Sequence, residues 1–364
     1  MPTRRRLQLA CLILFAVSLG LHGWDLSAPG LLDRTGRLKC PDFLQFYTYG
    51  TLARTGDIAG LYDPDTHANV ARAVIDPQLS LALFHPNYSP AIAWLFAPLS
   101  RLPYLRAMIV WLAISSTLYL LSIAMLLPAV RHLHREAQTI WLVAIAWPAF
   151  FIVLRYGQLS TLSLAILIVA VRCAARGQPL AAGMALGCLV YKPNLLVVPA
   201  LTLLMVGEWR MVIGLVAGAM LESLAAMTLA GRDVYAQYIG VLVTIAKHPE
   251  MVQLYPAESH SIGGALRLWS APPALVMVAT AIALLLAVFG CVTVWRSTTD
   301  HRPRWASLVL AALVSSPHLL TYDLLLLVVP IVLIADWVWD ITGKRPDGAW
   351  LALLVMLYLG AWPG

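Results

Sequence analysis

The stretch PALVMVATAIALLLAVFGCVTVW, residues 273–295, is almost entirely apolar and contains no charged side chain. A helix needs about 20 apolar residues to cross the hydrocarbon core of a bilayer, so this stretch predicts a transmembrane helix. Further apolar runs lie near residues 104–129, 138–153, 159–172, 180–191, 194–207, 211–230, 305–316, 324–340 and 349–363. With the N-terminal run, they predict an all-α polytopic transmembrane protein of about 10–12 spans, with helical outward-facing loops.

The overall composition agrees with a membrane protein. Of the 364 residues, 60% are hydrophobic and only 12% are charged, and the mean hydropathy is +0.78. Soluble domains carry about 25% charged residues, so the composition excludes a soluble globular enzyme and also intrinsic disorder. The net charge of +7 is explained by basic cytoplasmic loops, and no basic stripe with interleaved aromatic residues predicts a nucleic-acid partner.

Charge also predicts the orientation in the membrane. Three arginines at 4–6 precede the apolar run 7–24, which indicates an uncleaved first transmembrane helix with its N-terminus in the cytoplasm. Basic connectors that are expected to share the cytoplasmic side lie at 131–136, 172–177, 208–210 and 296–304. The chain is therefore expected to be one integral domain, 1–364, of the inner (plasma) membrane.

The remaining connectors should face the periplasm or the cell exterior. The first, 25–88, is rich in aspartate, and a loop of this length outside the membrane is uncommon without a function. The other outward segments are 155–158, 192–194, the long loop 231–272, and 315–323. The stretch 89–103 is apolar but contains three prolines, so we expect a re-entrant or broken segment there.

Polar residues that are costly at membrane depth collect on this predicted outward side. They are Asp42, His85, Asn87, Tyr88, Arg155, Gln158, Lys192, Asn194, His260, His318 and Asp323. Most of these residues lie beside predicted transmembrane segments, so each is expected to serve either structural pairing or function. All except His85 and Asn87 are taken as candidate site residues.

Asp42 is the candidate general base. Pro41 suits the first position of a helix, which places Asp42 in the first turn, where the helix dipole favours the ionised carboxylate. Such a carboxylate beside a membrane surface can accept a proton from a reacting hydroxyl. The alternative is an ordinary helix-start aspartate, followed by aromatic residues (Phe43, Phe46, Tyr47 and Tyr49) that form an interfacial belt.

Basic residues at helix breaks are candidate phosphate contacts. Lys192 lies between two apolar runs in LVYKPN, next to Asn194, and Arg155 lies near Gln158 in RYGQLS. Lysine binds phosphate as a point charge, and arginine binds it with two hydrogen bonds. The alternatives are a lysine that snorkels from a helix end and an arginine at the membrane boundary.

Two histidines and an aspartate complete the set. In SSPHLLTYDLL, His318 is expected to donate to a phosphate or a sugar hydroxyl, and Asp323 is expected to orient a neighbour or pair with a basic group. His260 lies in the second long loop, where sugar stacking and interfacial anchoring by nearby tyrosines are both open. A histidine within a membrane domain is otherwise an ordinary, hydrogen-bonded core residue.

No motif points to a cofactor or a metal. The chain lacks a Walker loop, a Rossmann glycine fingerprint, a His-Glu-x-x-His motif and a Cys-x-x-Cys pair. Asp63 and Asp65 flank Pro64, which favours a turn over a metal clamp. A nucleotide-sugar site is therefore not predicted, and neither a cofactor nor a metal is expected.

Five segments, taken in order, resemble glycosyltransferase family 87, the polyprenol-phosphate-mannose-dependent mannosyltransferase-like membrane proteins of the GT-C fold. They are DFLQFYTYGTLARTGDIAGLYDP (42–64), YSPAIAWLFAPLSRLP (88–103), GQLSTLSLAILI (157–168), AAGMALGCLVYKPNLLVVPALTLL (181–204) and SPHLLTYDLLLL (316–327). In the second outward loop the family usually has a stretch like Asn-Gln-Ser, where this chain has Ser259, His260 and Ser261.

The resemblance implies a function and a donor. It implies that Asp42 is the catalytic residue and that Lys192 and His318 are polar positions of the site. It implies inverting transfer of a sugar, with mannose suggested, from a polyprenyl phosphate to a lipid or glycan acceptor, without a metal. The alternatives from other classes are a transporter or lipid flippase of the cell envelope and a non-catalytic scaffolding subunit.

Overall fold

The computed structural model describes residues 4–75, 85–248, 251 and 259–360, and these residues are mostly helical. The first helices are α1 (Arg4–Leu26), α2 (Pro41–Thr55), α3 (Pro64–Val74), α4 (Pro90–Phe96), α5 (Tyr104–Leu126), α6 (Ala137–Ile145), α7 (Pro148–Tyr156), α8 (Ser160–Ala175) and α9 (Pro179–Gly187). The others are α10 (Val197–Val206), α11 (Trp209–Ala230), α12 (Arg232–Lys247), α13 (Ile262–Leu268), α14 (Pro273–Ser297), α15 (His301–Val314), α16 (Val328–Thr342) and α17 (Gly348–Leu359). Within these described ranges only isolated β-bridges occur, so the all-α prediction is confirmed.

Fewer helices than expected are long enough to cross a membrane. Among the described residues, five helices are long and apolar enough: Arg4–Leu26, Tyr104–Ala129, Trp209–Ala230, Pro273–Ser297 and Thr321–Thr342. A sixth is possible if α6 and α7, which meet at 44°, form one bent span. The expected 10–12 spans exceed this number because the apolar runs between residues 159 and 207 fold as helices of 10–17 residues.

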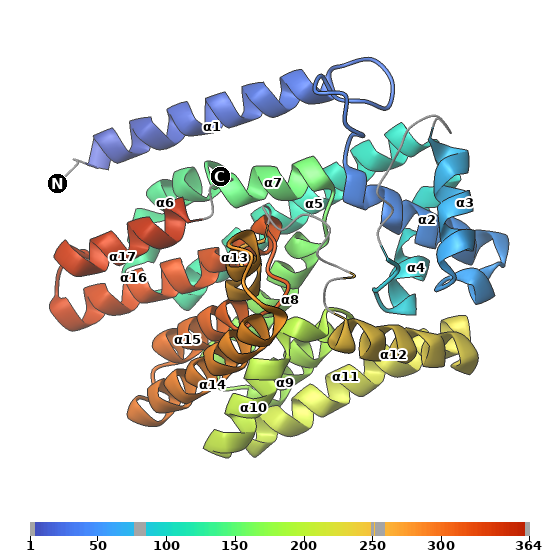
Figure 1. Ribbon diagram of the computed structural model, residues 1–364. Helices are drawn as coiled ribbons and strands as arrows, with labels where there is room; N and C mark the ends of the chain where they lie inside the picture. The colour runs from blue at the N-terminus through green and yellow to red at the C-terminus, as the bar shows by residue number, and fades with distance from the viewer. Residues whose placement is uncertain (1–3, 76–84, 249–250, 252–258, 361–364) are drawn as a thin grey trace.

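Short helices build the two loops that were predicted to face outward. The first loop, 25–88, contains α2 and α3, and the second, 231–272, contains α12 and α13. Residues 76–84, 249–250 and 252–258 of these loops lie outside the described part. Figure 1 shows α2, α3 and α4 together at one end of the molecule, next to α12. The prediction that the loops are helical is confirmed for the residues described, and the side of the membrane that they face stays a prediction.

Helix α2 is part of the core. Pro41 is its first residue and Asp42 lies in its first turn, as predicted. Phe43, Phe46 and Tyr49 are fully buried, so the interpretation of these aromatic residues as an interfacial belt is wrong. Phe43 and Phe46 pack instead against Phe96 at the end of α4, because the broken stretch 89–103 folds against α2 as two short helices.

The opposite end of the bundle gathers basic connectors. Two connectors that were predicted to share the cytoplasmic side, 131–136 and 296–304, meet there. Buried Asp336 accepts hydrogen bonds from backbone N–H groups of the first connector and from Arg302 of the second, at 2.8 Å. Arg4, at the start of α1, also forms an ion pair with the first connector. Two connectors that were predicted to share one side therefore meet in the fold, and the side of the membrane stays a prediction.

Helices α9 and α11 approach each other through glycines. Gly183 and Gly187 on α9 face Gly214 and Gly218 on α11, four residues apart on each helix. A Cβ atom added at any of these glycines would collide with the backbone of the other helix. Small residues at this spacing allow the backbones of membrane helices to pack closely.

We expect Gly218→Ala to destabilise the protein by about 1–3 kcal/mol, because the new methyl group collides with the carbonyl oxygen of Met184. Thermal unfolding in detergent, followed by tryptophan fluorescence, measures the effect. Gly240→Ala is the matched control, since Gly240 of α12 has open space around it. Equal melting temperatures for the two variants would contradict the proposed close packing.

Candidate active site

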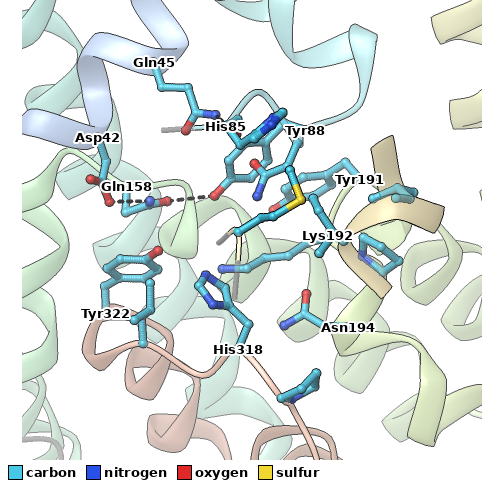
Figure 2. A pocket seen from close by; sticks show the side chains of 17 residues that line it. Asp42, Gln45, His85, Tyr88, Gln158, Tyr191, Lys192, Asn194, His318 and Tyr322 are labelled. Carbon is cyan, nitrogen blue, oxygen red and sulfur yellow. Dashed lines mark hydrogen bonds between the residues drawn. The ribbon is translucent and has the colours of Figure 1, made fainter. Parts of the chain in front are cut away.

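A cavity of about 180 Å³ lies where α2 meets the breaks between several helices. Its polar and aromatic lining consists of Asp42, Gln45, His85, Asn87, Tyr88, Gln158, Tyr191, Lys192, Asn194, His318 and Tyr322. Its apolar and proline lining consists of Pro193, Leu242, Ile245, Met251, Pro317 and Leu320. Figure 2 shows the labelled polar side chains converging on one space from separate segments. Of the predicted site residues, the fold brings together Asp42, Tyr88, Gln158, Lys192, Asn194 and His318.

Asp42 lines the cavity and is held there by a chain of hydrogen bonds. Its side chain is 4% exposed, and its Oδ2 accepts a hydrogen bond of 2.6 Å from Nε2 of Gln158. Oε1 of Gln158 accepts from the Tyr88 hydroxyl at 3.3 Å and from the backbone N–H of Leu159 at 3.1 Å. Because the Gln158 oxygen is occupied by two donors, its amide nitrogen is directed at Asp42 (Figure 2).

The backbone on both sides of this hydrogen bond has a special conformation. Cys40, directly before α2, has φ 51°, a left-handed conformation that is uncommon outside glycine. Gly157 ends α7 with φ 72°, and a Cβ atom there would lie 2.6 Å from Cβ of Phe43. The glycine therefore lets the α7–α8 turn approach α2 closely enough for Gln158 to contact Asp42.

Lys192 is held by a buried ion pair. The chain breaks at Pro193, and Lys192 Nζ pairs with Oδ1 of Asp323, which also accepts a hydrogen bond of 3.0 Å from the Ser160 hydroxyl. The ammonium lies 5.3 Å from the ring centroid of Tyr322, within cation–π range. Asp323 is 1% exposed and reaches the cavity only through Lys192, so its predicted pairing with a basic group is observed.

His318 and Asn194 complete this side of the cavity. Within the described part of the chain, Nδ1 of His318 is buried and has no hydrogen-bond partner. Burial lowers the pKa of the His318 imidazole to about 4, so the ring is neutral near pH 7. Asn194 Nδ2 donates a hydrogen bond of 3.0 Å to the Ser316 hydroxyl. A neutral histidine, an amide and a lysine therefore face the same space.

Comparisons with known proteins identify the family. The family model of glycosyltransferase family 87 matches residues 84–330, more than half of the chain. The chain belongs to glycosyltransferase family 87. A search of the curated proteins and a search of the solved structures each found no match. The protein is thus a membrane glycosyltransferase.

The family 87 match covers most of the cavity but not all of it. Residues from Tyr88 to Tyr322 that line the cavity lie inside the matched region, whereas Asp42 and Gln45 precede it. The assignment of Asp42 therefore depends on the geometry of the cavity and on the resemblance of residues 42–64, and it stays a prediction.

Two predicted residues do not line the cavity. Arg155 is exposed in the last turn of α7, on the other side of the Gly157 turn from Gln158. His260 is exposed, and its backbone N–H donates to the Leu319 carbonyl at 2.8 Å. The phosphate-contact hypothesis for Arg155 and the sugar-contact hypothesis for His260 therefore have no support from the cavity's geometry in this glycosyltransferase.

The structure adds cavity residues that the sequence analysis did not select. Gln45 follows Asp42 by three residues, so both side chains lie on one face of α2, a spacing that could have indicated it. Tyr191 and Tyr322 each directly precede a predicted residue at a helix break. His85 and Asn87 were recognised only as outward polar residues.

Metal binding was not expected for this enzyme. Among the described residues, no group of three or more histidine, cysteine, aspartate or glutamate side chains could hold a metal ion. Lys192 is the only lysine or arginine among the described residues that line the cavity. Metal-independent transfer stays a prediction.

We expect Lys192→Met and Asp323→Leu each to destabilise this family 87 member by about 3–5 kcal/mol, because either change leaves one buried charge without its partner. The double variant should be more stable than either single variant, since no buried charge remains. Melting temperatures of the wild type, the two single variants and the double variant, all in one detergent, form a double-mutant cycle. Additive losses in the double variant would show that the two charges are not coupled.

Acid should destabilise the folded enzyme partly through His318. Its pKa is about 4 when folded and 6.5 ordinarily, so between these values the unfolded chain binds more protons and stability falls as pH falls. We expect His318→Gln to lose less stability than the wild type between pH 6.5 and pH 4. Melting temperatures across this range test it, and parallel profiles for the two proteins would contradict the assignment.

Proposed function

We propose that this family 87 glycosyltransferase moves a sugar, mannose by resemblance, from a polyprenyl phosphate to a hydroxyl group of a lipid or glycan acceptor. The observation that carries the proposal is the cavity that holds the buried Asp42 carboxylate and, across it, the ammonium group of Lys192, the only one among the described lining residues. In a displacement reaction the base accepts the proton of the attacking hydroxyl and the cation stabilises the negative charge of the leaving group, so one cavity that holds both suits such a reaction.

In this mechanism Asp42 is the general base. As the acceptor oxygen attacks the anomeric carbon, its proton passes to the Asp42 carboxylate. The bond between the anomeric carbon and the phosphate oxygen breaks, and the polyprenyl phosphate leaves with the electron pair. The hydrogen bond from Gln158 orients the carboxylate during this step.

Lys192 and His318 would stabilise the leaving phosphate. Both line the cavity, and a fixed cation in a site of low water content stabilises developing negative charge more than it would in water. Asp323 would act as a positioning residue, because it holds Lys192 in place from behind. A metal would not be needed if Lys192 supplies the positive charge.

A cavity whose described lining has one carboxylate, which acts as the base, fits a single displacement that inverts the anomeric carbon. Retaining glycosidases use a second carboxylate as the nucleophile, about 5 Å from the first. Asp42 is the only carboxylate among the described residues that line the cavity, because Asp323 lies behind Lys192. This arrangement supports inversion at the anomeric carbon.

The proposed location is the inner (plasma) membrane, with the N-terminus in the cytoplasm and the cavity on the periplasmic or outer face. Basic connectors gather at one end of the bundle. Helices α2 and α12, which contribute lining residues to the cavity, lie at the other end (Figure 1). The positive-inside rule assigns the basic end to the cytoplasm. Membrane lipids are then the surroundings of the enzyme, and nucleic acid is not a partner.

Family membership favours an enzyme over a transporter or lipid flippase. A flippase needs a polar path that opens to both sides of the membrane. The polar residues that line the cavity come instead from helix ends and loops, which suits a reaction site.

We expect Asp42→Asn to lower sugar transfer by on the order of 10²- to 10⁴-fold, because the amide cannot accept the acceptor proton. Membranes that contain the variant are incubated with polyprenyl-phosphate mannose that is radiolabelled in the sugar, and the label transferred to the acceptor fraction is counted against the label left in the donor. Asp65→Asn is the matched control, since Asp65 also follows a proline at a helix start but is exposed. Equal transfer by Asp42→Asn and wild type would overturn the catalytic assignment.

A further inference from the structure

One wall of the cavity is built from polar groups that the proposed mechanism does not use. Gln45 lies one helical turn after Asp42 on α2 and is 7% exposed. Its Nε2 donates a hydrogen bond of 3.1 Å to the backbone carbonyl of His85, which ties residues 85–87 to α2. Gln45, His85 and Asn87 all line the cavity, and together they are called the amide wall below.

The segment that carries the amide wall is fixed from the other side as well. The backbone N–H of Tyr88 donates to the Tyr49 hydroxyl at 3.2 Å, and the Tyr62 hydroxyl donates to the Tyr88 carbonyl at 2.6 Å. Both tyrosines are buried. The positions of His85 and Asn87 are therefore set by α2 and its aromatic core before a ligand enters.

The amide wall and the cation occupy different sides of the cavity. Figure 2 shows Gln45 and His85 on one side of the chain formed by Asp42, Gln158 and Tyr88, with Lys192 and His318 on the other side. Asp42 thus lies between a wall without lysine or arginine and a wall that contains the only lysine among the described lining residues.

The chemistry of the amide wall suits neutral hydroxyl groups. Two side-chain amides and an imidazole offer hydrogen-bond donors and acceptors, and the wall contains no carboxylate, lysine or arginine. Nδ1 of His85 is buried and has no hydrogen-bond partner among the described residues, so one polar group of the wall is unpaired. An anionic group here would lie near the Asp42 carboxylate without a neighbouring lysine or arginine from the described lining.

We propose that Gln45, His85 and Asn87 form the acceptor subsite, and that it takes an uncharged, polyhydroxylated sugar residue with one hydroxyl presented to Asp42. The inference rests on the proposed function, because it needs Asp42 as the base. It goes beyond it by assigning the acceptor to one wall and the donor phosphate to the other. The inference excludes an acceptor whose headgroup is phosphorylated or otherwise anionic.

Equilibrium binding tests the inference without turnover. The full chain carrying Asp42→Asn is placed in lipid nanodiscs free of glycoside detergents, and calorimetry measures the binding of mannobiose, mannose 6-phosphate and farnesyl phosphate. We expect Gln45→Met and Asn87→Leu each to weaken mannobiose binding by about 5- to 10-fold, as for one lost hydrogen bond. Farnesyl phosphate binding should not change in these variants.

Two controls separate a subsite from a general effect on folding. Thr48→Val changes a fully buried polar residue of α2 that does not line the cavity, and it should leave binding of both ligands unchanged. The double variant Lys192→Met/Asp323→Leu should weaken farnesyl phosphate binding and leave mannobiose binding intact. Melting temperatures of all variants are compared first.

Several results would overturn the inference. They are no binding of mannobiose, tighter binding of mannose 6-phosphate than of mannobiose, unchanged mannobiose binding in Gln45→Met and Asn87→Leu, and equal weakening of both ligands in these variants. None of them depends on sugar transfer, so the failure of the subsite is distinguishable from a failure of Asp42 as the base, which the transfer assay measures separately.

Discussion

The buried ion pair between Lys192 and Asp323 is the interaction on which the site depends. It joins two breaks in the helical chain, one at Pro193 and one in the 3₁₀ segment Thr321–Leu327, and Ser160 at the start of α8 donates to the same carboxylate. Removing two charges from water is costly, and only close pairing with additional hydrogen bonds offsets that cost. The breaks must therefore stay together, and the cavity lies in front of them.

The same pair sets the charge that a substrate meets. The Lys192 ammonium is already balanced by Asp323, and Asp42 adds a carboxylate across the cavity, so the site does not bind anions strongly through net positive charge. A donor phosphate would have to share the lysine with Asp323. Such sharing favours release of the phosphate after transfer, because Asp323 is in place to take the ammonium back.

The sequence predicts the helical class and much of the cavity, and the limits of the prediction have physical causes. Proline and glycine positions locate breaks, so Gln158 and Lys192 were expected near Asp42, and they are. The direction of a side chain at a break depends on one turn: Gly157 directs Gln158 inward and leaves Arg155 exposed. Hydropathy also cannot distinguish an apolar run that forms one long helix from one that breaks midway, and fewer of the described helices are therefore long enough to span than the apolar runs predicted.

Burial of α2 explains why the proposed base lies within protein and not on the membrane surface. Aromatic residues of α2 pack into the core, and this packing holds Asp42 at the cavity wall. Across the cavity, Leu242 and Ile245 of the partly exposed helix α12 supply an apolar edge. A substrate with a polar head and an apolar tail can satisfy both surfaces at once, whereas a free sugar would leave the apolar edge in contact with water.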